Sequence, residues 1–205
     1  RSAVSTRLDV FVCPTSPGVR IDTHHVRGAA SMDYGAITEV EPLMFTNVLG
    51  IQNPGVRARQ GVLSGHSSAE LRQTTDGLSN SILLGECAGR PRVYVSGRLM
   101  TATQFLAYTG DEVLDNAGSC VVEDGTGWAD PDTSIDVGGM MPNGVQHSGP
   151  AVINAINAGE VYSFHTGGAN VLFADGSVQF LSESIDTWVF VTLCTRAGGE
   201  VTDGR

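Results

Sequence analysis

The sequence YSFHTGGANVLFADGSVQFL, residues 162–181, carries two apolar runs around one Asp-Gly pair. Hydrophobic and polar positions alternate on both sides of the pair, which is typical of a β-hairpin closed by a two-residue turn. With Asp175 and Gly176 as that turn, opposed residues share a face of the hairpin. The residues that would form one apolar patch facing a core are Val171, Phe173, Val178 and Phe180.

Further strands are predicted where short apolar runs end at turn residues. These runs are Leu8–Cys13, which stops at Pro14; the segment MDYGAI; Ser81–Gly85; and Arg92–Met100. Residues 111–150 are rich in acids, Gly and Pro and are predicted to be loop.

The best helix candidate covers residues 185–196. Ser184 is a suitable N-cap, Asp186 favours the first turn, and Gly198-Gly199 provides a stop. One stripe at helical spacing holds Ile185, Trp188, Val189, Thr192 and Leu193. The expected fold class is therefore α+β. The 170–181 hairpin belongs to an antiparallel sheet, and the helix packs on the apolar face of this sheet. Long Gly-rich loops complete a single domain over residues 1–205.

His165 and Asp175 are separated by nine residues and invite comparison with a catalytic or metal-binding pair. The strand between them spans roughly 17 Å at about 3.3 Å per residue, with His165 at one end and Asp175 at the turn. We therefore expect no contact between the two. Asp175 is interpreted as a turn residue, and His165 as a partner of the backbone near Gly167-Gly168 or as part of another site.

Composition narrows the classes of function. The chain has 205 residues, 41% of them hydrophobic, and a net charge of −10. Its twelve basic residues are all Arg and are scattered singly, so nucleic acid and anionic membrane surfaces are not expected partners. There is no GxSxG motif, and the histidines (His24, His25, His66, His147 and His165) have no specific metal-binding spacing, so no enzyme activity is expected.

The loop EDGTGWADPDTSID, residues 123–136, is the candidate metal site. Calcium takes six to eight oxygen ligands from flexible carboxylates and carbonyls. The candidate ligands are Asp124, Asp130, Asp132 and Asp136, although a solvated acidic loop is the simpler explanation of these residues. Trp128 in the same loop is the candidate ligand-binding aromatic residue. No cofactor is required, and Ca²⁺ is the one that this loop suggests.

Several segments together resemble the H-X9-DG domain of prepilin-like DUF1559 proteins, a family expanded in Planctomycetes. The resemblance rests on FVCPTSPG, TTDGLSNSILLGE, AVINAINAGEVYSFH, the stretch from His165 to Asp175-Gly176, and TRAGGE, in the order found in the family. Asp76, Gly77, Asn80 and Glu86 fall in its second segment, and we expect structural roles for them. Ala151 and Ala155 stand where the family often has Cys, so its cysteine pairing does not transfer.

The family is similar to type IV pilins and type II secretion pseudopilins. The resemblance implies a pilin-like sheet, an upstream peptidase site, and an apolar N-terminal helix that is the only contact with the membrane. It also implies an extracytoplasmic location and other pilin-like subunits, or the protein itself, as partners. The expected function is that of an exported structural or assembly subunit. The alternative is a ligand- or carbohydrate-binding module on a pilin-like anchor.

The four cysteines allow three pairings, or none if all are buried thiols. Export, which the resemblance implies, favours disulfides. Our hypothesis pairs Cys13 with Cys194, which would clamp the two ends of the chain, and leaves Cys87 to pair with Cys120.

Overall fold

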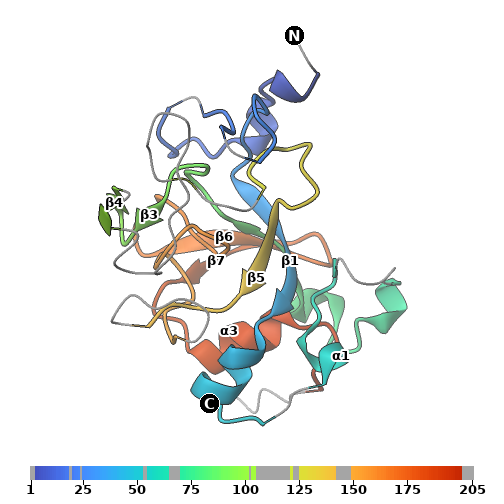
Figure 1. Ribbon diagram of the computed structural model, residues 1–205. Helices are drawn as coiled ribbons and strands as arrows, with labels where there is room; N and C mark the ends of the chain where they lie inside the picture. Colours follow the sequence, from blue (N-terminus) through green and yellow to red (C-terminus); the bar gives the residue numbers. More distant parts are fainter. Residues whose placement is uncertain are drawn as a thin grey trace.

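The computed structural model describes residues 3–18, 20–23, 25–52, 55–64, 70–101, 103–104, 121, 125–141 and 149–199. Its main element is a five-stranded sheet with the strand order β5-β1-β2-β6-β7 (Figure 1). The strands are β1 (Tyr34–Val40), β2 (Ile82–Glu86), β5 (Ser134–Val137), β6 (Gly168–Phe173) and β7 (Val178–Ser182). β3 (Tyr94–Val95) and β4 (Arg98–Leu99) form a separate small hairpin.

The pairs β1–β2, β2–β6 and β6–β7 are antiparallel, as expected, whereas β5 runs parallel to β1. The α+β class predicted from the sequence is confirmed, with a mixed sheet. β5 lies in the acidic stretch that was predicted to be loop. Its burial alternates along Ser134–Val137, and Ile135 and Val137 are fully buried beside β1.

Helical structure is sparse. In the part of the chain that the structure describes, the helical elements are α1 (Val56–Arg59), α3 (Thr187–Cys194), a π-helical turn at Met44–Val48, and 3₁₀ turns at Ala3–Ser5, Asp9–Phe11, Leu71–Gln73 and Leu78–Asn80. The 3₁₀ turn at Asp9–Phe11 replaces the first predicted strand, Leu8–Cys13. Among the described residues, no helix has the length and apolar character needed to cross a bilayer.

α3 packs against β1 and β2 and closes the hydrophobic core, below the sheet in Figure 1. Its N-cap is Asp186, whose carboxylate accepts a hydrogen bond from the backbone N–H of Val189, so the prediction of Ser184 as N-cap is wrong. The predicted buried stripe is also wrong in part, because Phe190, Val191 and Cys194 are the most buried side chains. A helix that is apolar on all sides offers no periodic signal for choosing the face.

The β6–β7 hairpin exists, but its register differs from the predicted one by a single residue. The backbone N–H of Phe173 donates to Ser177 O, and Leu172, rather than Phe173, faces Val178. The turn therefore has three residues, with Gly176 at a φ of +90°. A one-residue slip moves every side chain of a strand to the opposite face.

Because the observed register differs from the predicted one, apolar side chains of β7 are exposed rather than buried. Val171 and Phe173 are buried as expected, whereas Val178 and Phe180 are 66% and 50% exposed. These two side chains lie on the face of the sheet opposite α3. The prediction that all four residues share the core face is wrong.

Candidate functional site

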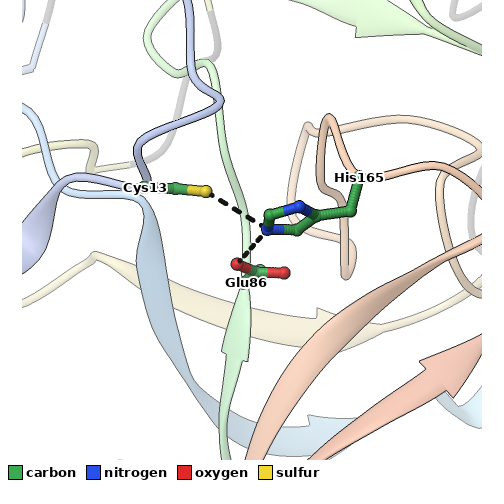
Figure 2. A group of neighbouring side chains, drawn as sticks. All are labelled: Cys13, Glu86 and His165. Carbon is green, nitrogen blue, oxygen red and sulfur yellow. Dashed lines mark hydrogen bonds and ion pairs between the residues drawn. The ribbon is translucent and has the colours of Figure 1, made fainter.

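Three segments that are distant in the sequence meet at one end of the sheet and bring Cys13, Glu86 and His165 together. Nε2 of His165 lies 3.5 Å from the Cys13 sulfur and 3.3 Å from Oε1 of Glu86. Figure 2 shows both contacts ending on the same ring nitrogen. Each of the three residues stands out in the sequence, but Cys13 was expected in a disulfide and Glu86 in a structural role.

Glu86 is the last residue of β2, and its side chain is 2% exposed. Its Oε2 accepts a 2.7 Å hydrogen bond from the backbone N–H of Asn170 in β6. The Asn170 side-chain amide donates to the same carboxylate. The sheet itself therefore fixes the position of this buried acid.

Cys13 is held by Asp33, a residue that no sequence motif marks. The backbone N–H of Cys13 donates to Oδ2 of Asp33 over 2.9 Å, and the N–H of Gly89 donates to Oδ1. Arg20 forms an ion pair with Oδ2 at 2.6 Å, and both side chains are almost completely buried. Asp33 sits one residue before a strand with no motif around it, so no local sequence signal points to this role.

His165 lies in the loop that leads into β6. Its backbone N–H donates to Oγ of Ser163, which in turn donates to Gly168 O. Gly167, with a φ of +83°, makes the turn between the two. The imidazole ring packs edge-on to Phe180 with a centroid separation of 6.5 Å.

Negative charge dominates this end of the sheet. Burial raises the pKa of the neighbouring Tyr34 to about 12, and Cys13, Glu86 and Asp33 raise it further. Arg20 balances Asp33, but among the described residues no arginine contacts Glu86, whose only potential cation is His165.

This geometry does not support a nucleophilic relay. A Cys–His–acid relay uses both ring nitrogens, one for the thiol and one for the acid that orients the ring. Here Cys13 and Glu86 contact the same nitrogen. Cys13 is also 1% exposed, so a substrate cannot reach its sulfur.

A hollow of about 510 Å³ lies beside His165. Its lining includes Ser96, Asn154, Tyr162, Phe164, His165 and Glu183. Neither Cys13 nor Glu86 lines it, so the imidazole separates the buried cluster from the hollow.

Asp175 stands apart from His165, at the tip of the β6–β7 turn. Its carboxylate accepts hydrogen bonds from the backbone N–H and the hydroxyl of Ser177, at 2.9 and 2.7 Å. These two bonds lower the pKa of the Asp175 carboxyl.

The motif around Asp76 contacts the chain just after α3. The Asp76 carboxylate accepts from the backbone N–H groups of Gly198 and Gly199, at 2.9 and 3.3 Å. Gly77 has a φ of +101°, and the Asn80 side chain donates to Asp76 O. All of these contacts are within the fold and none points into the hollow.

The four candidate calcium ligands do not form one site among the described residues. Asp130 and Asp132 lie together, but His25 occupies both carboxylates, at 2.7 and 3.3 Å. Asp136 belongs to a separate group with Glu39 and Glu41, and its carboxylate accepts from the Thr38 hydroxyl. Asp124 lies outside the described residues, as do His24, His66 and His147. The assembled oxygens fall short of what calcium takes.

His25 is a counter-ion of the acidic loop. Its hydrogen bond to Asp130 is the main cause of its raised pKa, and Asp132 and Asp22 contribute by their charge. The imidazolium is therefore favoured in the folded protein.

Trp128 is half-buried and has internal partners. Its indole N–H donates to Thr6 O over 2.9 Å, and its ring stacks on Phe11 with a centroid separation of 6.5 Å. Trp128 does not line the hollow beside His165.

Cys13 and Cys194 are free, buried thiols, so the predicted disulfide between them is wrong. Cys13 lies by His165, whereas Cys194 ends α3 within the core, where burial raises the pKa of its thiol. The Cys87 sulfur donates to Asn157 O over 3.3 Å, which is not the contact of a disulfide, and its predicted partner Cys120 lies outside the described residues.

A model of the family described as proteins of unknown function (DUF1559) matches residues 1–187. Because the match covers most of the chain, the protein belongs to the DUF1559 family. Neither a curated protein nor a solved structure matches this chain.

Proposed function

We propose that this DUF1559 protein is a non-catalytic assembly subunit, located outside the cytoplasm, that joins a filament or secretion complex of the cell surface or envelope through strand β7. The observation that carries the proposal is the exposure of Val178 and Phe180, at 66% and 50%, on a strand at the edge of the sheet.

The edge of β7 lacks the features that keep sheets from pairing with other chains. Natural edge strands are usually protected by Lys, Pro, bulges or a covering element. The sequence of β7, VQFLS, contains no charged residue and no Pro, and its register with β6 runs without a bulge. Its free backbone groups are suited to strand addition from a partner.

The apolar surface continues from β7 across the sheet. Val178 faces Leu172 of β6, and Leu172 faces Leu84 of β2, so the three side chains form one row on the same face. Leu84 and Leu172 are partly exposed. A row of this kind offers a flat apolar contact to a second copy of the chain or to another pilin-like subunit with an equivalent strand.

The hollow beside His165 supports a second candidate, the ligand- or carbohydrate-binding module. It combines the rings of Tyr162 and Phe164 with the polar groups of Asn154 and Glu183. Trp128, the aromatic residue expected to serve such a module, instead packs on Phe11. We therefore place this function second.

Photo-crosslinking of the full-length protein in its own cell tests the assembly proposal. Phe180 is replaced by p-benzoylphenylalanine, which keeps an aromatic ring at this position. The control carries the same group at Val56 in α1, which is 59% exposed. We expect a crosslinked product at position 180, identified by mass spectrometry as the protein itself or another DUF1559 subunit, and none at position 56.

A second variant separates contact from function. With p-benzoylphenylalanine placed at Val178 instead, Phe180→Lys puts a charge on the edge strand and should abolish both the crosslink and assembly. Leu71→Lys, at another exposed apolar position, should leave both intact. Equal crosslinking at positions 180 and 56, or assembly that tolerates Phe180→Lys, would refute the proposal. Protease digestion of intact cells and of cells with a permeabilised outer membrane tests the location, since a cytoplasmic protein would survive both.

A further inference from the structure

We infer that Cys13, Glu86 and His165 bind a divalent transition-metal ion of the zinc class through one sulfur, one nitrogen and one oxygen atom. This inference does not depend on the assembly function, because none of the three ligand atoms belongs to β7, although the imidazole of His165 lines the hollow and packs against Phe180. It rests on the spacing of the atoms, on the charge of the site and on the rigidity of its supports.

The two distances from Nε2 of His165 match tetrahedral coordination of a shared ion. Zinc bonds of about 2.0–2.1 Å to nitrogen and oxygen and about 2.3 Å to sulfur place neighbouring ligand atoms roughly 3.3–3.6 Å apart. Nε2 of His165 lies 3.3 Å from Oε1 of Glu86 and 3.5 Å from the Cys13 sulfur. All three ligand atoms lie within 4.8 Å of one another. The contact between Nε2 of His165 and Oε1 of Glu86, at 3.3 Å, is long for a charged hydrogen bond of a buried carboxylate, which usually measures about 2.7–2.9 Å.

A bound cation would offset the negative charge of the site. A buried carboxylate is costly unless a positive group offsets it. Glu86 is 2% exposed, and the thiol of Cys13 lies close to it, so ionisation of both would place two negative charges around one imidazole. A dication bound to the thiolate and the carboxylate makes the site neutral. Binding releases the thiol proton to solvent and requires His165 to carry its own proton on Nδ1.

The supports of the three ligands are fixed before any metal binds. Glu86 is held by the backbone of Asn170, the backbone of Cys13 is held by Asp33, and His165 is held through Ser163. Such contacts beyond the ligands orient them and are typical of metal sites. Cys13 and His165 are 152 residues apart, so a bound ion would join the N-terminal segment to the loop before β6.

The ligand set selects the class of metal. A thiolate excludes Mg²⁺ and Ca²⁺, which take oxygen ligands, and a mixed S, N, O set at tetrahedral spacing suits zinc. Three protein ligands leave the fourth tetrahedral position for a water molecule.

Cobalt substitution tests the inference on protein without a polyhistidine tag. After treatment with a chelator, the protein is titrated with Co²⁺, which takes zinc sites and reports sulfur ligation by a thiolate-to-cobalt absorption band. We expect one equivalent to bind with this band, and excess Zn²⁺ to remove it. X-ray absorption of the zinc-loaded wild-type protein should show one sulfur among nitrogen and oxygen neighbours, which requires no variant to fold.

Variants assign the ligands. Cys13→Ser should abolish the band, and His165→Gln should weaken Co²⁺ binding at least about tenfold, with far-UV circular dichroism as the test of folding. Cys87→Ser, which keeps a donor for Asn157 O, and His25→Gln, in the acidic loop, are the matched controls and should bind as the wild type does. The inference is overturned by a wild-type protein without the band or without a sulfur neighbour, by a band that survives Cys13→Ser, or by binding that is lost in either control.

Discussion

Glu160 is a buried acid whose ionisation should control the stability of the whole fold. Its side chain lies in the core, where Oε1 accepts hydrogen bonds from the N–H groups of Gly138 and Gly139, at 2.8 and 2.6 Å. Oε2 has no partner among the described residues. Burial raises the pKa of this carboxyl to about 8 in spite of the two backbone donors, and the charges of Glu41 and Asp136 raise it further. The folded protein therefore holds Glu160 in its neutral form at pH 7.

The direction and size of the pH effect follow from linkage. Between the ordinary pKa of 4.5 and about 8, the unfolded chain has lost this proton while the folded chain retains it. The folded state binds more protons, so the free energy of unfolding falls as pH rises, by about 1.4 kcal/mol per pH unit. The total reaches about 5 kcal/mol, which is a large share of the roughly 5–15 kcal/mol that stabilises a typical domain.

Urea denaturation of the wild type and of Glu160→Gln at several pH values measures this effect. The amide oxygen keeps the two backbone donors satisfied and does not titrate. The difference in unfolding free energy between the two proteins removes the contribution of other groups, including His25. We expect the wild type to lose about 3 kcal/mol relative to the variant between pH 5.5 and 7.5. A difference that stays constant over this range would refute the reasoning, because Glu160 would then carry the same charge in the folded and the unfolded protein.

Two further predictions concern the loop before β6 and the acidic loop. Gly168→Ala should destabilise the protein on the order of 3 kcal/mol, because a Cβ at this position would overlap the backbone oxygen of Leu181. Gly167→Ala has open space around it and should cost only about 1 kcal/mol, for its φ of +83°. Equal losses of stability in thermal unfolding would contradict this difference. His25→Gln should lower the free energy of unfolding below pH 6.5, by less than about 1 kcal/mol because the side chain is 37% exposed. The effect should disappear as pH rises through the raised pKa of His25. A larger effect at pH 9 than at pH 6 in paired urea titrations would disprove the ion pair with Asp130.

The sequence was most informative where local chemistry decides the structure. The Asp-Gly pair located the turn of the β6–β7 hairpin, and the apolar run at Ser81–Gly85 located β2. The length of the turn was not predictable, because Asp-Gly suits both a two-residue turn and a three-residue turn with Gly176 in the left-handed region. This single ambiguity reversed the faces of Val178 and Phe180.

The candidate metal site could not be predicted for a different reason. Cys13, Glu86 and His165 are brought together by the pairing of β2 with β6 and by the contact of Asp33 with the N-terminal segment. Neither of these long-range contacts leaves a spacing pattern in the sequence. β5 was missed similarly, since its partner in the parallel pair, β1, lies about a hundred positions earlier in the chain.

The nine residues between His165 and Asp175 set the distance between the imidazole and the turn of the hairpin. Six of them form β6, whose one end fixes the imidazole beside Glu86 and whose other end opens the turn. Deleting one residue from β6 would turn its inner face outward, and deleting two would restore the faces but draw the ends about 6.6 Å closer, twice the 3.3 Å that separates the imidazole from the carboxylate. Changes of length in this segment should therefore be far less tolerated than changes of side chain, and length variation in the hairpin is expected beyond Asp175, in the turn itself.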